Sequence, residues 1–177
     1  SVGLPQGSGT ANCTVTSAAG SASDTAAWKF DSVYPAVTPV LTGTLGGGGW
    51  HTSNVNVAVT GTDATSGVRS TRVQFNGSWY AGGITITNEG SSYLLYEVTD
   101  GAGNTTQRGG YVEIDRTAPA LHTYISGWLG SNGWYTSNPT IFVEGFDVHS
   151  GVATERVQVS GLGWQNSGYT ISQDGSY

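Results

Sequence analysis

Apolar and polar residues alternate along much of the chain with a repeat of two residues. Valines stand at every second position from Val55 to Val59. The same alternation occurs in further segments, at 71–75, 84–86, 94–98 and 112–114. Alternation of this kind places one set of side chains in a core and the other in water, so each segment is predicted to be a half-buried β-strand. An opening strand is expected near 39–44.

Turn-forming residues separate these segments, and no segment shows helical spacing. The sequence contains 28 Gly and 5 Pro. Runs such as Asn76-Gly77 and Asp100–Asn104 supply residues that tolerate a positive φ. Six or seven short strands joined by such turns in about 80 residues predict an all-β chain built of two-sheet sandwiches.

The sequence repeats itself at a spacing of 84 residues. GWHTSN at 49–54 returns as GWYTSN at 133–138, and RVQ at 72–74 returns at 156–158. Separate blocks that recur in one register are typical of a modular array rather than of one enzyme with one pocket.

A weaker copy of the pattern lies at the start of the chain, where 15–21 matches 98–104. We therefore expect three parts. Residues 1–38 form the C-terminal strands of one module, residues 39–119 form a complete module, and residues 120–177 form a module that lacks its last strands.

Two explanations of the unfinished parts stay open. The chain is a piece of a longer array, or residues 11–37 of one subunit complete 120–177 of the next by strand addition. In the second case the inward side chains, which contact the neighbouring subunit, are Cys13, Val15, Trp28 and Phe30. A joined seam would duplicate one strand, because 1–9 and 169–177 both resemble 83–91, and this favours the first explanation.

Cys13 is the only cysteine, so no disulfide forms within one chain. It matches Tyr96 in the repeat, an inward strand position. Cys13 is therefore expected to be a small buried hydrophobe, with an intermolecular bridge or a reactive thiol as the alternatives.

Three motifs follow one another in the complete module: Thr62–Val68, Tyr96–Asn104 and Ile114–Pro119. Together they resemble bacterial immunoglobulin-like (fibronectin-like) repeats of secreted and cell-surface proteins. The resemblance covers essentially the whole chain. It implies tandem immunoglobulin-like β-sandwiches, one complete and two partial, in extracellular stalks, adhesins, sheaths or filaments. The first part departs from the pattern, because Ser17 and Ser21 replace the Asp and Asn of the loop.

Charge and hydropathy exclude two classes of partner. The formal net charge is −6, and an acidic surface repels phosphate backbones, so no nucleic-acid binding is expected. No apolar run approaches the length that crosses a bilayer, so no membrane span is expected. The composition suits a secreted, extracellular protein.

Recurrent aspartates stand in loops and at the module junctions. Asp63, Asp100, Asp115 and Asp147 are candidate calcium ligands, and Asp31 is the earlier copy of Asp115. Calcium requires six to eight oxygens, which junctional carboxylates and loop carbonyls supply in part. The alternative is that each Asp caps a turn by accepting hydrogen bonds from nearby backbone N–H groups.

Trp79 and Trp164 are copies of each other near Gly-rich turns, and they are candidates for stacking on sugar rings. No catalytic pattern is found: His51, His122 and His149 share no motif, and no paired carboxylates flank an evident cleft. We therefore expect a non-catalytic extracellular structural protein that forms a surface filament, sheath or stalk, by homopolymerisation or beside further repeats of its own chain. The alternative is an adhesin or carbohydrate-binding accessory module of a larger secreted protein, which contacts a cell-surface glycan.

Overall fold

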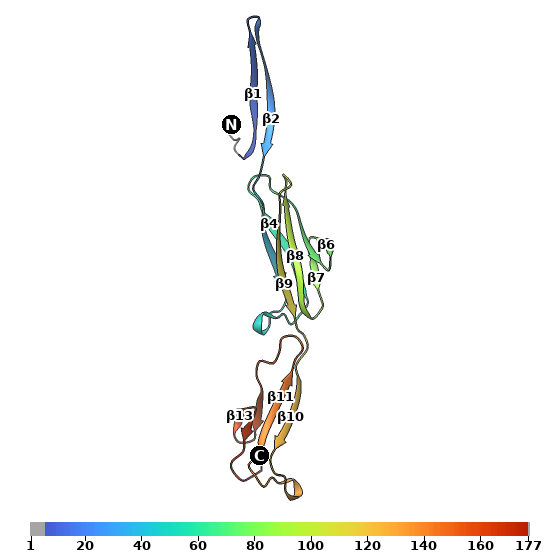
Figure 1. The fold of residues 1–177 in the computed structure, drawn as a ribbon, viewed down its shortest axis with the longest axis vertical. Helices are drawn as coiled ribbons and strands as arrows, with labels where there is room; N and C mark the ends of the chain where they lie inside the picture. The colour runs from blue at the N-terminus through green and yellow to red at the C-terminus, as the bar shows by residue number, and fades with distance from the viewer. Residues whose placement is uncertain (1–5, 177) are drawn as a thin grey trace. The chain divides into compact units, whose positions relative to one another are not determined.

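The computed structural model describes residues 6–176, which form β-strands and two short 3-10 turns, with no α-helix among them (Figure 1). Residues 1–5 of the predicted first part, and Tyr177, lie outside the described residues. The chain divides into two compact units, Ser1–Ile114 and Asp115–Tyr177. All strand pairs are antiparallel, so the predicted all-β class is confirmed.

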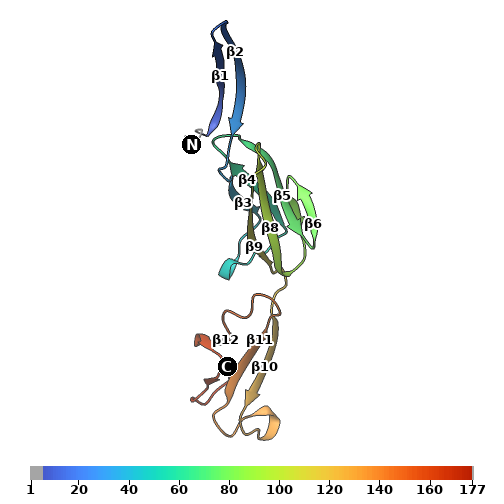
Figure 2. The ribbon, with the colours of Figure 1, turned by 45° about the horizontal axis from the view of Figure 1, so that its top comes forward.

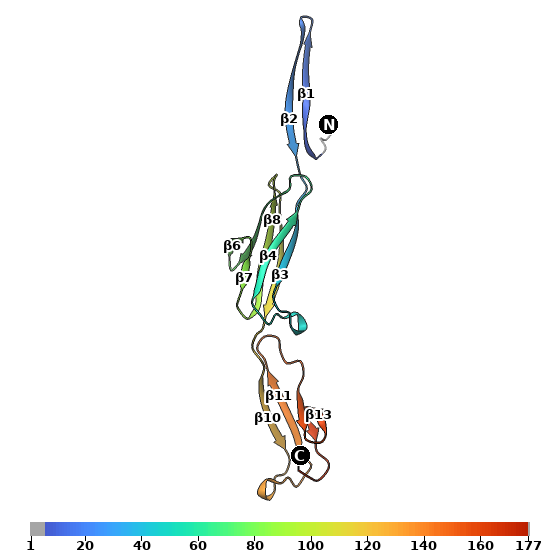
Figure 3. The same cartoon turned by 180° about the vertical axis from the view of Figure 1, so that it is seen from behind.

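Two sheets of the first unit enclose one apolar core. One sheet has the order β3-β4-β7, and the other has the order β6-β5-β8-β9 (Figures 2 and 3). Their bounds are β3 Ala36–Thr42, β4 Val55–Thr62, β5 Val68–Phe75, β6 Ser78–Ala81, β7 Ile84–Ile86, β8 Gly90–Asp100 and β9 Thr105–Ile114. The opening strand begins at Ala36 rather than near Pro39, and the other predicted strands are confirmed.

The core follows from the alternation in the sequence. Its buried members are Val55, Val57, Val59, Val73, Ile86, Leu94, Tyr96, Val98, Val112 and Ile114. Half of them come from the hairpin of β8 and β9, which therefore contributes as much core as the remaining strands together. The arrangement is consistent with the predicted β-sandwich.

The second unit repeats the first part of this arrangement. Its strands are β10 Ala120–Ser126, β11 Thr140–Phe146, β12 Arg156–Val159, β13 Gly163–Asn166 and β14 Tyr169–Thr170. They form a sheet of order β10-β11-β14 and a two-stranded sheet β12-β13, as β3-β4-β7 and β5-β6 do in the first unit. The bridge between Leu45 and His51 recurs between Leu129 and Tyr135, so the 84-residue period is also present in the backbone pairing.

The start of the first unit is a long hairpin of β1 (Gly7–Ser17) and β2 (Gly20–Phe30), joined through Ala18 and Ala19. The two strands pair with each other and with no other described strand (Figure 1). Every residue of β2 except Trp28 is exposed. The expectation that Cys13 is buried is wrong for the single chain, because nothing packs on this face of the hairpin and the thiol is exposed.

Leu94→Ala is expected to lower the free energy of unfolding of the first unit by about 2–5 kcal/mol, because it leaves a cavity in the middle of β8. Leu94 is fully buried, whereas Leu45 in the same unit is 64% exposed, so Leu45→Ala serves as a control with an effect under about 0.5 kcal/mol. Urea unfolding combined with hydrogen exchange of the β8 amides measures both. Equal effects of the two substitutions would contradict the assigned core.

Candidate functional site

Three carboxylates from distant parts of the sequence meet in the first unit. Asp31 follows β2, Asp63 follows β4, and Asp100 ends β8. Each offers a carboxylate oxygen, and these oxygens all lie within 4.8 Å of one another. This acidic cluster joins the linker after the hairpin to two loops of the sandwich.

Asp63 organises the loop between β4 and β5. Its Oδ1 accepts hydrogen bonds from the backbone N–H groups of Thr65, Ser66 and Gly67 at 3.1, 2.9 and 2.9 Å. Its Oδ2 is buried and has no hydrogen-bond partner among the described residues. The cluster therefore contains one carboxylate oxygen that the neighbouring polar groups leave unsatisfied.

Asp100 organises the loop between β8 and β9 in the same way. Its Oδ1 accepts from the N–H groups of Ala102, Gly103 and Asn104 at 2.9, 2.7 and 2.8 Å, and its Oδ2 accepts from Asn104 Nδ2 at 2.8 Å. Burial alone would raise the pKa of this fully buried carboxyl, but the hydrogen bonds from Asn104, Gly103 and Ala102 outweigh it and hold the pKa below its ordinary value.

Asp31 ties the linker to both loops. Its Oδ1 accepts from Val33 N–H at 3.0 Å, and its Oδ2 accepts from Ser66 N–H at 3.1 Å. Asn104 Nδ2 in turn donates to the backbone oxygens of Asp31 and Val33 at 3.3 and 3.2 Å. The linker is thus held by polar contacts of the cluster.

The second unit contains the same arrangement around Asp115 and Asp147. Asp115 accepts from Thr117 N–H and Ser150 N–H, both at 3.0 Å, and Asp147 Oδ1 accepts from His149 N–H at 3.0 Å and Gly151 N–H at 2.8 Å. The side-chain hydrogen bond with Ser150 is the main reason why the pKa of Asp115 lies below its ordinary value. Backbone donors and the charge of His149 act in the same direction, against burial.

Of the predicted metal ligands, Asp63 and Asp100 come together with Asp31, and Asp115 lies with Asp147. Asp31 was not selected from the sequence as a ligand, although its 84-residue relation to Asp115 is the signal that identifies it. Calcium takes six to eight oxygens, whereas the cluster offers three carboxylates whose oxygens mostly accept backbone N–H groups. These contacts support turn capping, and calcium binding at these aspartates stays a prediction.

The inward residues predicted for subunit contact lie together on one face of the β1–β2 hairpin. Cys13, Val15 and Phe30 are exposed, and Trp28 lies partly buried across Gly9, where an added Cβ would meet its ring at 2.7 Å. This face of the hairpin, mostly apolar but with Asp24 opposite Cys13, has no covering layer in the described structure.

The two candidate sugar-contact residues differ in accessibility. The guanidinium of Arg72 lies over the ring of Trp79 at 4.3 Å from its centroid, so one face of this indole is occupied. Trp164 on β13 is 62% exposed. Sequence reasoning missed an exposed aromatic pair, Tyr93 and Tyr111. The centroids of their rings are 5.1 Å apart on the outer face of β8 and β9. Their outward positions in the alternation were the available signal.

No protein-family model matches this sequence, and a search of curated proteins found no significant relative. Over residues 6–176 no helix has the length and apolar character needed to cross a membrane.

Asp63→Ala is expected to lower the free energy of unfolding of the first unit by about 1–3 kcal/mol, because three backbone N–H groups lose their acceptor. Asp63→Asn keeps an oxygen at this position and is expected to lose much less. Urea unfolding of both variants, with EDTA and with added calcium, separates the two roles. A calcium-dependent stabilisation of the wild type that Asp63→Asn abolishes would identify the cluster as a cation site instead.

Acid is expected to weaken the first unit through Asp100. The unfolded carboxyl has its ordinary pKa of 3.8 and the folded carboxyl a lower one, so the stabilisation is present above pH 3.8 and is lost as the pH falls through the folded pKa. Asp100→Asn, which does not titrate, is expected to flatten this dependence. Unfolding free energies measured from pH 6 to pH 2 test this, and identical slopes for the two proteins would contradict it.

Proposed function

We propose that this chain is a non-catalytic, extracellular structural protein whose immunoglobulin-like modules form a surface filament, sheath or stalk. The observation that carries the proposal is the recurrence of one three-dimensional unit. Strand order, the 3-10 turn before β4 and β11, and the aspartate-capped loop all return after 84 residues.

The strand order supports the immunoglobulin-like assignment. The sheet β3-β4-β7 faces the sheet β6-β5-β8-β9. Each sheet contains one pair of adjacent strands that are not consecutive in the sequence, β4 with β7 and β5 with β8. Sandwiches of the immunoglobulin and fibronectin type III kind share this two-sheet antiparallel architecture. An architecture of this kind serves many roles, so the proposed role depends on the repetition rather than on the fold.

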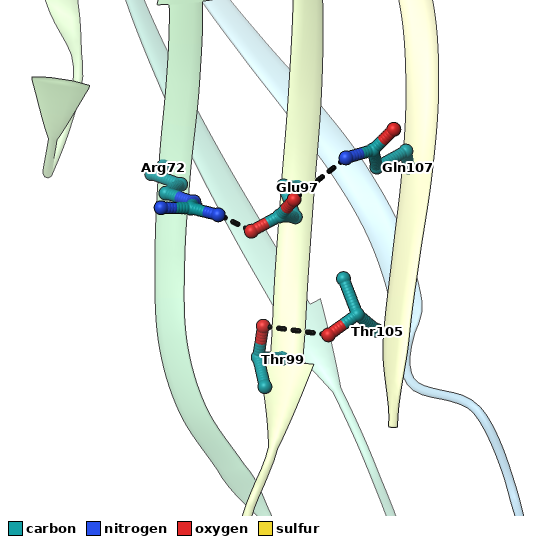
Figure 4. Close-up of polar contacts among 5 residues, drawn as sticks. All are labelled: Arg72, Glu97, Thr99, Thr105 and Gln107. Carbon is teal, nitrogen blue, oxygen red and sulfur yellow. Dashed lines mark hydrogen bonds and ion pairs between the residues drawn. The ribbon is translucent and has the colours of Figure 1, made fainter. Parts of the chain in front are cut away.

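The contacts of the polar residues also favour a structural role. The aspartates of the acidic cluster accept backbone N–H groups of their own loops, and the buried Glu97 accepts from Arg72 Nε at 2.5 Å and from Gln107 Nε2 at 2.7 Å (Figure 4). Burial would raise the pKa of Glu97, yet these hydrogen bonds and the Arg72 charge lower it. Carboxylates held in this way stabilise loops and sheet rather than stand ready for proton transfer.

Immunolabelling of intact source cells tests the proposal. An antibody against the first unit is expected to label unpermeabilised cells along fibres or a surface layer, with regular spacing in electron micrographs. Labelling that appears only after permeabilisation would contradict an extracellular role.

Carbohydrate binding is the second candidate, because Trp164 presents an exposed indole of the kind that stacks on sugar rings. In that case Trp164→Ala is expected to reduce binding on a glycan array about two- to tenfold, since aromatic stacking contributes about 0.5–1.5 kcal/mol. Trp79→Ala is the matched control with a small effect, because Arg72 already covers that ring. Absence of glycan binding by the wild type would leave only the structural role.

A further inference from the structure

The β1–β2 hairpin has the same architecture as the β8–β9 hairpin that completes the first unit. Gly90 pairs with Ile114 and Thr99 with Thr105 in β8–β9, and the counterparts Gly7 with Phe30 and Thr16 with Ser21 pair in β1–β2. No register shift separates the two hairpins over their length.

The outer faces of the two hairpins carry matching polar pairs. Thr99 and Thr105 share a hydroxyl hydrogen bond of 3.0 Å (Figure 4), and their counterparts Thr16 and Ser21 share one of 2.9 Å. Thr14 and Ser23 bond at 3.1 Å where Glu97 and Gln107 bond in β8–β9. The outer face of the β1–β2 hairpin therefore carries paired polar side chains that suit contact with water.

The inner faces differ in whether they are covered and in which side chains they carry, since Asp24 stands opposite Cys13 where Arg108 stands opposite Tyr96. In β8–β9 the inward residues Leu94, Tyr96, Val98, Val112 and Ile114 are buried in the core. Their counterparts in β1–β2 are Ala11, Cys13, Val15, Trp28 and Phe30. Ala11 and Cys13 are smaller than their counterparts, Val15 is the same residue, and Trp28 and Phe30 are larger. Val15 is 74% exposed in the described chain. Phe30 is also exposed and Trp28 is only partly buried, and uncovered neighbouring apolar side chains of this kind mark a contact site.

Over the described residues, the second unit has an unpaired strand edge at the position that β8 occupies in the first unit. Strand β5 pairs with β6 on one edge and with β8 on the other, whereas its counterpart β12 pairs only with β13 among the described strands. A hollow of about 530 Å³ lies beside it, with a mixed lining that includes the apolar Ile141, Val159 and Ile171 and the polar Asn138 and Gln158. In the first unit the counterparts of Ile141 and Ile171 are Val57 and Ile86, which are buried. An unpaired strand edge beside such a hollow is a site for strand addition.

We propose that the β1–β2 hairpin of a second copy of this chain occupies this place and completes the sandwich of residues 120–171 as β8–β9 completes the first unit. This inference rests on the proposed structural function. Cys13 of one copy then lies opposite Val157 of the next, because Tyr96 pairs with Val73. Thr14 lies opposite Arg156, because Glu97 pairs with Arg72. The contact is heterologous, so each copy has one donor and one acceptor and assembly proceeds head to tail.

Disulfide trapping in the full chain tests the register. Antiparallel partners have Cα atoms about 4.5–5.5 Å apart, within the range that a disulfide spans. Val157→Cys is therefore expected to form a ladder of covalent oligomers with Cys13 under mild oxidation, seen on a non-reducing gel. Gln158→Cys, one residue away on the opposite face of β12, is the matched control and is expected to give no ladder. A cross-linked monomer, or equal ladders for both variants, would overturn the proposal.

Association measured by sedimentation gives a second, independent readout. Val15→Asp is expected to weaken self-association on the order of 100-fold or more, because it buries an unpaired charge, while Thr10→Asp on the outer face leaves it nearly unchanged. Thr14→Glu is expected to strengthen association about two- to five-fold by placing a carboxylate opposite Arg156. Since Val15 is exposed in the single chain, urea unfolding of the first unit stays unchanged in these variants and reports correct folding.

A wild type that stays monomeric at high concentration, with Cys13 freely reactive towards thiol reagents, would overturn the second-copy proposal. Surface labelling of intact cells would still be expected in that case. Failure of strand addition and failure of the structural role are thus separate results.

Discussion

The first unit depends on the packing of one hairpin, β8–β9, which forms half of the four-stranded sheet, against the three-stranded sheet. Strand β8 lies between β5 and β9, and its inward side chains meet those of β4 and β7 in a single apolar cluster. Without that hairpin the first three-stranded sheet would have no opposing layer over much of its length. A module of this size buries only about 60% of its unfolded surface even when complete. Loss of a hairpin therefore removes a large share of the driving force for folding.

The acidic cluster adds a polar constraint to this apolar one. Asp31, Asp63 and Asp100 each hold a different segment, so the linker, the β4–β5 loop and the β8–β9 loop are fixed with respect to one another by hydrogen bonds. Gly101 lies so close to the Ser66 carbonyl that an added Cβ would meet its oxygen at 2.5 Å. The end of the sandwich is thus closed by backbone and carboxylate contacts rather than by apolar packing.

The sequence was sufficient to predict the strands whose side chains alternate strictly. Val55 to Val59 alternate, and this segment is a half-buried strand in the structure. In 94–98 the inward Leu94, Tyr96 and Val98 are buried as predicted, although Leu95 interrupts the alternation and Glu97 is buried too. The repeat spacing predicted that 120–177 copies the first strands of the complete module. The start of β3 was misplaced, because Ala36 and Thr38 give a weak signal. The burial of Cys13 was predicted from its counterpart Tyr96, but a face is buried only when another layer packs on it, and alternation within one strand does not show whether that layer is present.

The candidate site was predicted less completely. Loop position identified Asp63 and Asp100, yet their meeting with Asp31 depends on how the linker folds back onto the loops, which no local pattern encodes. The difference between Trp79 and Trp164 depends on the Arg72 side chain across the strand pair. Both outcomes arise from contacts between residues that are distant in sequence or lie on neighbouring strands.

The tight turn at Ala18 and Ala19 has a consequence for any assembly that uses the β1–β2 hairpin. Ser17 and Gly20 stand where Asp100 and Asn104 close the acidic cluster in the first unit, because Thr16 and Ser21 pair as Thr99 and Thr105 do. A sandwich completed by this hairpin would combine Asp115 and Asp147 with a neutral hydroxyl instead of a third carboxylate. Such a fibre would contain two chemically distinct kinds of joint in strict alternation. One kind has three carboxylates from a single polypeptide, and the other has two carboxylates where polypeptides meet. Acid or divalent cations would therefore act on the two kinds of joint unequally.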